Sequence, residues 1–396
     1  MNHLKEIILE TSASLLDELS GLRRHFHMNP ELSFEEFETA GFIGSKLDES
    51  GISYRKGITG TGIIAEIKGS LEGDKVIALR AEMDALPVCE KNQVPYASKT
   101  EGRMHACGHD AHMAMLLVTA KILNSMQDKF GGTILLIFQP GEELSPGGAR
   151  LMIESGALDN PAPDIVIAQH VLPELAIGKV GYKAGMYMAS SDEIYITVKG
   201  TGGHAALPHN VTDQIYIASR LVVRIKDTIT SLQAGNMIPT VLGIGKIRGD
   251  GATNVIPDKV EIAGTFRTFD EGWRKEAKDI IGRIAKEVAD EHGVQIDVRF
   301  AEGYPVLEND KDLTGKAVLL SKDLLGGDNV EKFDLRMSSD DFAFFASAFP
   351  SVYYRVGVSR KGEKTRMLHS PDFDIDEQGM VTGVANMIWL AMNFLK

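Results

Sequence analysis

Hydrophobic and polar residues follow alternating helix-like and strand-like patterns along the first half of the chain. Apolar residues at helical spacing predict helices over 4–26, 34–50, 111–123 and 147–155. Short runs of Ile, Val and Leu predict strands over 62–67, 76–79, 133–138 and 165–168. Apolar strands that alternate with helices are typical of a parallel sheet covered on both faces. The first half therefore predicts an α/β domain.

The pattern changes after residue 185. Predicted strands over 193–199, 241–248, 259–267 and 294–300 combine with helices over 213–230 and 273–288. Their β-α-β-β-α-β order is that of the split ferredoxin-like unit. After Pro305 the α/β pattern returns, with a helix over 313–325, a strand over 352–358 and a helix over 377–395. We therefore predict a mixed, mainly parallel sheet domain built from 1–185 and 304–396, with a ferredoxin-like α+β domain inserted over 186–303.

Composition and charge narrow the class of protein. The 396 residues are enough for two or three domains at about 150 residues each. A net charge of −13 argues against nonspecific binding to nucleic acid or to an anionic membrane. Two cysteines make no disulfide framework, and no apolar run approaches the ~20 residues of a membrane span. Glu6 and Glu10 stand where a signal peptide would be apolar, so we expect a cytoplasmic protein.

Residues that bind metals or transfer protons follow the predicted strands at their carboxyl ends. In order along the chain these clusters are Arg80-Ala-Glu82-Met-Asp84, Cys107-Gly-His109-Asp110-Ala-His112, Gln139-Pro-Gly-Glu142-Glu143, Gln169-His170 and His369. Ligands of open parallel sheets bind at this edge. Thiolates, imidazoles and carboxylates are ligands of zinc and neighbouring transition metals. The placement therefore indicates a metal site.

Each of these residues alone has an ordinary structural interpretation. A lone cysteine is usually part of a core, a lone histidine is usually structural, and adjacent glutamates usually face solvent. Five clusters at one sheet edge favour a shared site, because the ordinary interpretation would have to hold at every strand end. The sequence lacks the motifs of other enzyme classes: the serine-nucleophile turn G-x-S-x-G, the phosphate-binding loop G-x-x-x-x-G-K-[ST] and the zinc motif H-E-x-x-H. The turn at Gly60 only weakly matches a dinucleotide-binding turn.

Several spaced motifs together resemble one known family. They are Arg23-Arg-His-Phe-His-Met-Asn-Pro-Glu-Leu32, Arg80-Ala-Glu-Met-Asp-Ala-Leu-Pro87, Cys107-Gly-His-Asp-Ala-His112, Gln139-Pro-Gly-Glu-Glu143, Gln169-His170, Gly202-Gly-His-Ala-Ala-Leu-Pro-His209 and Leu368-His-Ser-Pro371. The chain resembles the M20 metallopeptidase family over nearly its whole length. It is most similar to the amidohydrolase branch of hippurate hydrolases, N-acyl-amino-acid deacylases and auxin-conjugate hydrolases.

The resemblance implies two divalent metal ions per chain, which could be zinc, manganese, cobalt or nickel. Cys107 would bridge the ions. His109 and His170 would complete the ligands of one ion, and Glu143 and His369 those of the other. Three protein ligands per ion leave room for a bridging water, as a catalytic metal site requires.

The resemblance also implies residues that act beside the metals. Glu142 would be the general acid/base, and Asp84 would orient a ligand histidine. The chain departs from the branch at two positions: Glu82 replaces the usual aspartate, and Ser338 replaces the usual glycine. We assign no role to Glu82, and we expect Ser338 to narrow the substrate pocket.

The inserted domain carries the remaining candidates. In the resembled family this domain forms a dimer and acts as a lid, and a histidine like His204 reaches the active site of the partner subunit. Asn254 and Arg267 match positions that could bind the free carboxylate of a substrate. The ordinary interpretations are a turn histidine, a turn-capping asparagine and a strand-end arginine. We leave the other histidines structural or unassigned: His3, His25, His27, His105, His112, His209 and His292.

Three functions are compatible with these residues. The leading hypothesis is a homodimeric metal-dependent amidohydrolase that splits an N-acyl amino acid into a carboxylic acid and a free amino acid. A dipeptidase would use the same chemistry on an aminoacyl group. A non-catalytic dimeric binding protein is the third hypothesis, but it would not need Glu142.

Overall fold

The computed structural model describes residues 2–359 and 365–396, which form two compact units. The first unit comprises 1–185, 308–334 and 341–396, and the second comprises 186–307 and 335–340. Residues 335–340 therefore group with the second unit, although the sequence predicts them in the α/β domain. The main-chain N–H of Ala189 contacts the carbonyls of Arg336 and Ser338, both at 3.1 Å. These long-range hydrogen bonds leave no local sequence signal.

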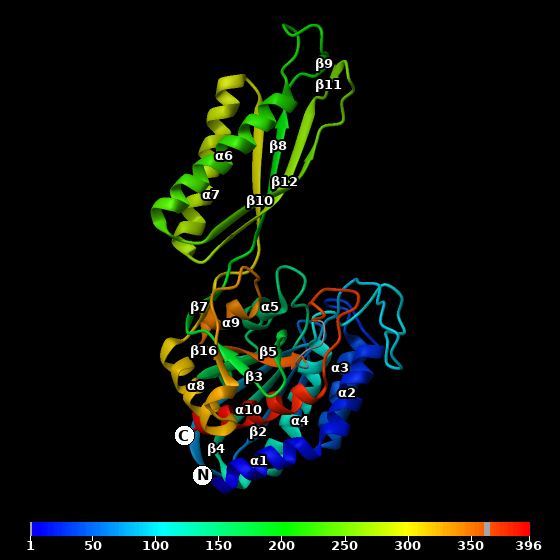
Figure 1. Cartoon of the computed structure of the whole chain (residues 1–396), viewed down its shortest axis with the longest axis vertical. Helices are drawn as coiled ribbons and strands as arrows, with labels where there is room; N and C mark the ends of the chain where they lie inside the picture. The colour runs from blue at the N-terminus through cyan, green and yellow to red at the C-terminus, as the bar shows by residue number, and fades with distance from the viewer. Residues whose placement is uncertain (1, 360–364) are drawn as a thin grey trace. The chain divides into compact units, whose positions relative to one another are not determined.

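The first unit contains most of the helices and one large sheet (Figure 1). Its helices are α1 (Asn2–Ser14), α2 (Leu16–Met28), α3 (Phe37–Glu49), α4 (His109–Ser125), α5 (Gly148–Glu154), α8 (Lys311–Leu325), α9 (Phe342–Ala348) and α10 (Gln378–Phe394), with 3-10 turns η1 (Gln127–Lys129) and η2 (Gly327–Asn329). Its strands are β1 (Ser53–Ile58), β2 (Gly62–Lys68), β3 (Leu71–Glu82), β4 (Gly131–Gln139), β5 (Ile165–Ala176), β6 (Val180–Tyr182), β15 (Val330–Lys332) and β16 (Ser351–Ser359). Short strands β7 (Gly185–Met188) and β14 (Leu307–Asn309) lie where the chain passes between the units.

The large sheet is mixed, with a parallel centre. Its strand order is β1-β2-β4-β3-β5-β16-β6-β15. Strands β4, β3, β5 and β16 run parallel, and their carboxyl ends meet at one edge. Helices α4 and α10 pack against β3, and α9 packs against β16. The predicted α/β class is confirmed.

Two details of the first unit differ from the sequence prediction. The predicted helix over 4–26 is two helices, because α1 ends at Ser14 and α2 begins at Leu16. Strand β2, predicted as part of a parallel sheet, runs antiparallel to β1 and β4. It forms a hairpin with β1 through a turn in which Thr59 has a φ of 53° and Gly60 a φ of 108°.

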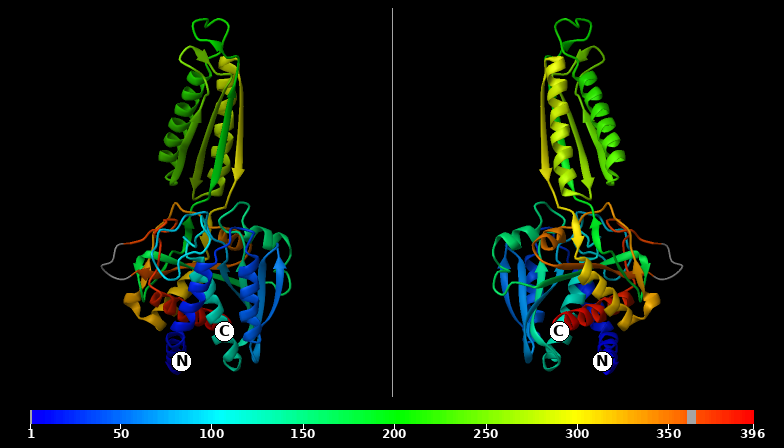
Figure 2. Two further views of the ribbon diagram at one scale, coloured as in Figure 1. Left: turned by 90° about the vertical axis from the view of Figure 1, so that its right-hand side faces the viewer. Right: turned by 90° about the vertical axis from the view of Figure 1, so that its left-hand side faces the viewer.

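The second unit has the predicted ferredoxin-like order. Its elements are β8 (Asp192–Lys199), β9 (Gly203–His204), α6 (Gln214–Asn236), β10 (Thr240–Arg248), β11 (Val255–Ile256), β12 (Lys259–Thr268), α7 (Glu271–His292) and β13 (Gln295–Glu302). The four long strands form an antiparallel sheet in the order β10-β12-β8-β13, and both helices lie on one of its faces (Figure 2).

The helical stripe predicted in the second unit forms its core. Trp273, Ile281 and Val288 of α7 are buried against inward-facing residues of β8 and α6 such as Ile196 and Leu221. The Asp270 carboxylate caps the start of α7 by accepting a hydrogen bond from the N–H of Trp273. Burial of this face stabilises the unit by the hydrophobic effect.

Candidate metal centre

Three parallel strands and a loop bring four clusters of candidate residues together at one edge of the sheet. Strand β3 ends at Glu82 and leads to Asp84, β4 ends three residues before Glu142, and β5 contains His170. A loop supplies His369, whose main-chain N–H donates to the carbonyl of Ala106 at 2.7 Å.

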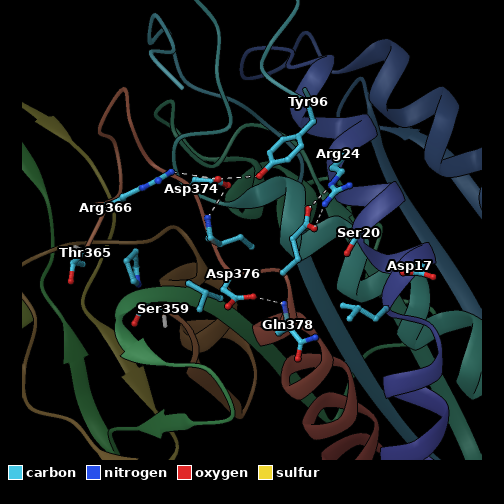
Figure 3. Close-up of a pocket in the computed structure, with 15 residues that line it drawn as sticks. Asp17, Ser20, Arg24, Tyr96, Ser359, Thr365, Arg366, Asp374, Asp376 and Gln378 are labelled. Atoms are coloured by element: carbon cyan, nitrogen blue, oxygen red, sulfur yellow. Dashed lines mark hydrogen bonds and ion pairs between the residues drawn. The ribbon is translucent and has the colours of Figure 1, made fainter. Parts of the chain in front are cut away.

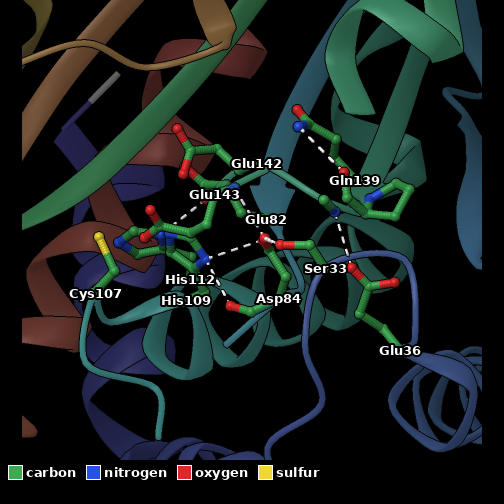
Figure 4. Close-up of polar contacts among 12 residues, drawn as sticks. Ser33, Glu36, Glu82, Asp84, Cys107, His109, His112, Gln139, Glu142 and Glu143 are labelled. Carbon is green, nitrogen blue, oxygen red and sulfur yellow. Dashed lines mark hydrogen bonds and ion pairs between the residues drawn. The ribbon is translucent and has the colours of Figure 1, made fainter. Parts of the chain in front are cut away.

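Gly108 shapes the turn between Cys107 and the first residue of α4. It has a φ of 90°, which favours glycine, and a Cβ at this position would lie 2.4 Å from Cγ2 of Val171. The turn leaves Cys107 outside the helix and His109 as its first residue. A cysteine and a histidine two positions apart can therefore face the same centre (Figure 4).

Cys107 lies between two groups of possible ligands. Its Sγ is 3.4 Å from Nε2 of His170 and 3.3 Å from Nε2 of His369. Donor atoms of Cys107, His109 and His170 all lie within 4.8 Å of one another, and so do those of Cys107, Glu143 and His369. The structure thus brings together all five sequence-predicted ligands, and their division between two ions stays a prediction.

Main-chain carbonyls orient two of the imidazoles. Nδ1 of His109 donates to the carbonyl of Asp84 at 2.8 Å, and Nδ1 of His170 donates to the carbonyl of Val171 at 2.8 Å. Each ring is therefore protonated at Nδ1 when neutral, which leaves the Nε2 lone pair for a cation. Within the described residues, Nε2 of His109 is buried and has no hydrogen-bond partner, and Oε1 of Glu143 is buried 3.3 Å from Nε2 of His369.

The electrostatics of this centre suit a cation. Burial raises the pKa of the Cys107 thiol well above its usual value, and the nearby Glu143 raises it further. Burial lowers the pKa of His109, but its contact with Asp84 and the charge of Glu82 outweigh this effect and raise it to about 10. The buried carboxylates around His109 thus favour a positive charge at this centre. A bound divalent ion can supply that charge in place of the proton on His109. Thiolate, imidazole and carboxylate donors fit zinc and its neighbours.

His369 differs from the other four candidate ligands in exposure and backbone conformation. Its side chain is 53% exposed, whereas Cys107, His109 and His170 are buried. Its φ of 62° lies in the left-handed region, where a residue other than glycine is strained. Such strain concentrates at functional sites.

Glu142 lies beside both sets of candidate ligands. Its side chain is 6% exposed, and Oε1 accepts a hydrogen bond from the N–H of Asp341 at 3.4 Å. One of its oxygens lies within 4.8 Å of donor atoms of His109 and Glu143. This position suits a group that exchanges protons with a molecule bound at the centre.

The structure shows contacts of Glu82 and His112 that sequence reasoning missed. Nδ1 of His112 donates to Oε2 of Glu82 at 2.8 Å, and Arg80 forms an ion pair with the other oxygen of Glu82. All three side chains are buried. The spacing of His109 and His112 could have predicted that His112 lies near the metal centre, because residues three positions apart share one face of a helix.

The candidates in the second unit fall into two places. Strands β9 and β11 pair His204 with Val255, and the N–H of Ala205 donates to the carbonyl of Asn254 at 3.0 Å. His204 and Asn254 are therefore neighbours, and both are exposed. Arg267 lies at the opposite end of β12, where its guanidinium donates to the carbonyl of Met337 at 2.9 Å.

A polar cavity of about 680 Å³ lies elsewhere in the first unit (Figure 3). Several of its charged side chains interact with neighbouring residues. Arg24 binds Glu377 through two hydrogen bonds, and Asp374 accepts from Tyr96 at 3.0 Å. Because none of the five clustered ligands lines it, we do not treat it as the site of the chemistry.

The fold and the clustered ligands define a metal-binding hydrolase of the α/β class. The profile of Peptidase family M20/M25/M40 matches residues 78–393, and the chain belongs to this family. Within the family it is a metal-dependent amidohydrolase.

No helix in the part of the chain that the structure describes has the length and hydrophobicity needed to span a membrane.

Known proteins support this assignment. The chain is 41% identical to the N-acetyl-L-cysteine deacetylase of Bacillus subtilis over 381 residues, which cover 96% of this chain and 88% of that protein. It is 42% identical to the N-acyl-L-amino acid amidohydrolase of Geobacillus stearothermophilus over 290 residues, or 73% of this chain and 77% of that one. The crystal structure of the YXEP protein of Bacillus subtilis is described as a dinuclear metal-binding peptidase from the M20 family. It matches with a TM-score of 0.83 and 33% identity, covering 97% of this chain and 99% of that one.

Proposed function

We propose that this protein hydrolyses the amide bond of N-acyl amino acids with two divalent cations, releasing a carboxylic acid and a free amino acid. The observation that carries the proposal is the position of Cys107 Sγ, within 3.4 Å of Nε2 of both His170 and His369. One thiolate can thereby serve two ligand sets. The names of the two similar enzymes above, a deacetylase and an amidohydrolase, support an N-acyl amino acid as substrate.

In this proposal His109 and His170 would hold one ion, Glu143 and His369 would hold the other, and Cys107 would serve both sets. Zinc, manganese, cobalt and nickel all accept such donors. When bound, the ions polarise the substrate carbonyl and lower the pKa of a water.

Glu142 performs the proton transfers in this proposal. Its carboxylate accepts a proton from the attacking water and then donates it to the leaving amine. The hydrogen bond from the N–H of Asp341 holds one of its oxygens in place. Asp84 supports the ligands, since it contacts His109 and accepts a hydrogen bond from the N–H of Glu143 at 2.9 Å.

The second unit supplies substrate contacts in the proposed homodimer. His204 provides a donor for the carbonyl oxygen of a substrate bound to the partner subunit. Asn254 and Arg267 bind the free carboxylate, and because they lie at opposite ends of β12 they would come from different subunits. The adjacency of His204 and Asn254 across β9 and β11 supports a shared role for these two residues. We also propose that the enzyme acts in the cytoplasm, where the unpaired thiol of Cys107 stays reduced.

Metal analysis and a substrate screen test the proposal together. The purified protein should contain two divalent ions per chain, lose activity to a chelator, and regain it with zinc, manganese or cobalt. Cys107→Ser should weaken the binding of both ions, because a hydroxyl stays protonated where a metal-bound thiol does not. Cys89→Ser is the matched control, since this second free cysteine is exposed and outside the cluster.

The screen compares acetyl- and benzoyl-amino acids with dipeptides. Turnover of the acyl compounds supports the proposal. Turnover of dipeptides alone would replace it with a dipeptidase, and two bound ions without any turnover would indicate a binding protein. One ion or none in the fully active enzyme would reject the two-metal site.

A further inference from the structure

Four residues form a continuous chain of buried contacts beside the proposed metal centre. Arg80 of β3 pairs with Glu82, Glu82 accepts a hydrogen bond from Nδ1 of His112, and the N–H of Val171 donates to Nε2 of His112 at 3.0 Å. The side chains of Arg80 and Glu82 are 0% exposed, and that of His112 is 1% exposed. Figure 4 draws Glu82 and His112 among the polar residues of this centre.

The hydrogen bonds determine which nitrogen of His112 carries the proton. A main-chain N–H can only donate, so Nε2 of His112 must accept from Val171. Nδ1 therefore carries the proton and donates it to Glu82. Both nitrogens of this ring are thus used, and neither has a lone pair available for a metal ion.

The main chain of Val171 also reaches a proposed ligand through its carbonyl. The carbonyl of Val171 accepts the hydrogen bond from Nδ1 of His170, which sets the direction of Nε2 of His170 toward Cys107. The N–H of Val171 is held by His112. A carboxylate and an imidazole therefore restrain the main chain of β5 at the point where it orients His170.

We propose that Glu82 and His112 are positioning residues for His170, and that they selectively strengthen binding of the ion held by His109 and His170. The inference rests on the proposed two-ion function. The other ligand set has different supports: the N–H of Glu143 binds Asp84, and the N–H of His369 binds the carbonyl of Ala106. Loss of His112 should therefore affect one ion more than the other.

An alternative is that Glu82 and His112 bind a cation themselves. Donor atoms of Glu82, His109 and His112 lie within 4.8 Å of one another. The direct hydrogen bond of 2.8 Å between His112 and Glu82 argues against it, because an ion between these atoms would have to break it. This alternative predicts a third ion per chain, so counting the bound ions distinguishes it from the positioning role.

The test measures ions bound per chain against free zinc set by a metal buffer. His112→Asn retains an amide that can donate to Glu82 but cannot reach Val171, so it keeps the carboxylate paired. His112→Ala removes both contacts. Both variants should bind one ion as tightly as the wild type and the other on the order of 10–100-fold more weakly, the usual effect of removing a group that orients a ligand.

Ser321→Ala is the matched control for a general loss of stability. Ser321 is buried in the same unit and contacts Tyr182 and Asn386, away from every proposed ligand. This variant should lower the melting temperature and leave both zinc affinities unchanged.

Three results would overturn the inference. Folded His112 variants could keep both affinities or lose both in parallel, and either result would show that His112 does not act through His170. A wild type with three ions, one of which His112→Asn loses, would make His112 a ligand. A wild type with fewer than two ions would instead reject the proposed function on which the inference rests.

Discussion

Asp84 contacts His109 with its main chain as well as its side chain. The carbonyl of Asp84 accepts the hydrogen bond from Nδ1 of His109 at 2.8 Å, while carboxylate Oδ1 lies 3.4 Å from the same nitrogen. The other carboxylate oxygen accepts from Ser33 at 2.6 Å and from the N–H of Glu143 at 2.9 Å. Asp84 therefore links two of the proposed ligands, one from each set.

This arrangement predicts the effect of Asp84→Ala. The variant keeps the carbonyl that orients His109 but removes the acceptor for the N–H of Glu143. We expect kcat/KM and the affinity for metal to fall on the order of 10–100-fold, with the ion held by Glu143 and His369 affected more. A zinc titration followed by kinetics at saturating zinc measures both. Wild-type affinity for that ion would show that the carboxylate does not support Glu143.

Glu142→Gln tests the proposed acid/base. The substitution preserves size and can still accept the hydrogen bond from Asp341, but it removes the titrating oxygen. We expect kcat to fall on the order of 10²–10⁴-fold, the usual cost of losing a positioned acid/base, while metal content stays at the wild-type level. Steady-state kinetics together with metal analysis provides the check. If kcat stays near the wild-type value, the proton acceptor is another group.

His27 predicts a pH dependence of stability. Burial lowers its pKa, but hydrogen bonds to Asp110 and Glu90 outweigh burial and raise it from 6.5 to about 9. Because folding raises the pKa of His27, protonated His27 stabilises the folded protein. This contribution to the free energy of unfolding is complete below pH 6.5 and is lost as the pH rises toward 9. The loss is on the order of 3 kcal/mol.

Urea unfolding between pH 6 and 9 measures this contribution. His27→Gln should be less stable than the wild type at pH 6, and the difference should shrink as the pH rises. His25→Gln is the control, because His25 lies on the same helix but burial lowers its pKa, so the difference between this variant and the wild type should not shrink as the pH rises. A difference between His27→Gln and the wild type that does not change with pH would contradict the prediction.

His204 should act on the site of the partner subunit in the proposed homodimer. His204→Ala and Glu142→Ala should each be nearly inactive alone. After subunit exchange, random pairing makes half of the dimers mixed, with one intact site of two, so about a quarter of wild-type activity should return. His209→Ala, at the other end of the same motif, is the control and should stay active without exchange. Exchange confirmed by mass without recovery of activity would reject the role in trans.

The local pattern of the sequence determined the order of elements and the kinds of residue at the strand ends. Hydrophobic periodicity indicated the α/β class and the β-α-β-β-α-β order, because each depends on which face of a short segment is apolar. The carboxyl ends of parallel strands meet at one edge of a sheet, so the sequence alone predicts that Asp84, Glu142 and His170 lie near one another. The resemblance to a family then divided the ligands into two sets.

Some features of this protein depend on contacts between segments that are far apart in the sequence, and only the tertiary structure shows them. The direction of β2, the grouping of 335–340 with the second unit, and the separation of Arg267 from His204 follow from strand pairing and long-range hydrogen bonds. The same is true of His112, which the sequence left unassigned because nothing local shows that its nitrogens meet Glu82 and the main chain of Val171. Residue types can be read along the chain, but which atom of each faces its neighbour is determined only when the strands and helices pack together.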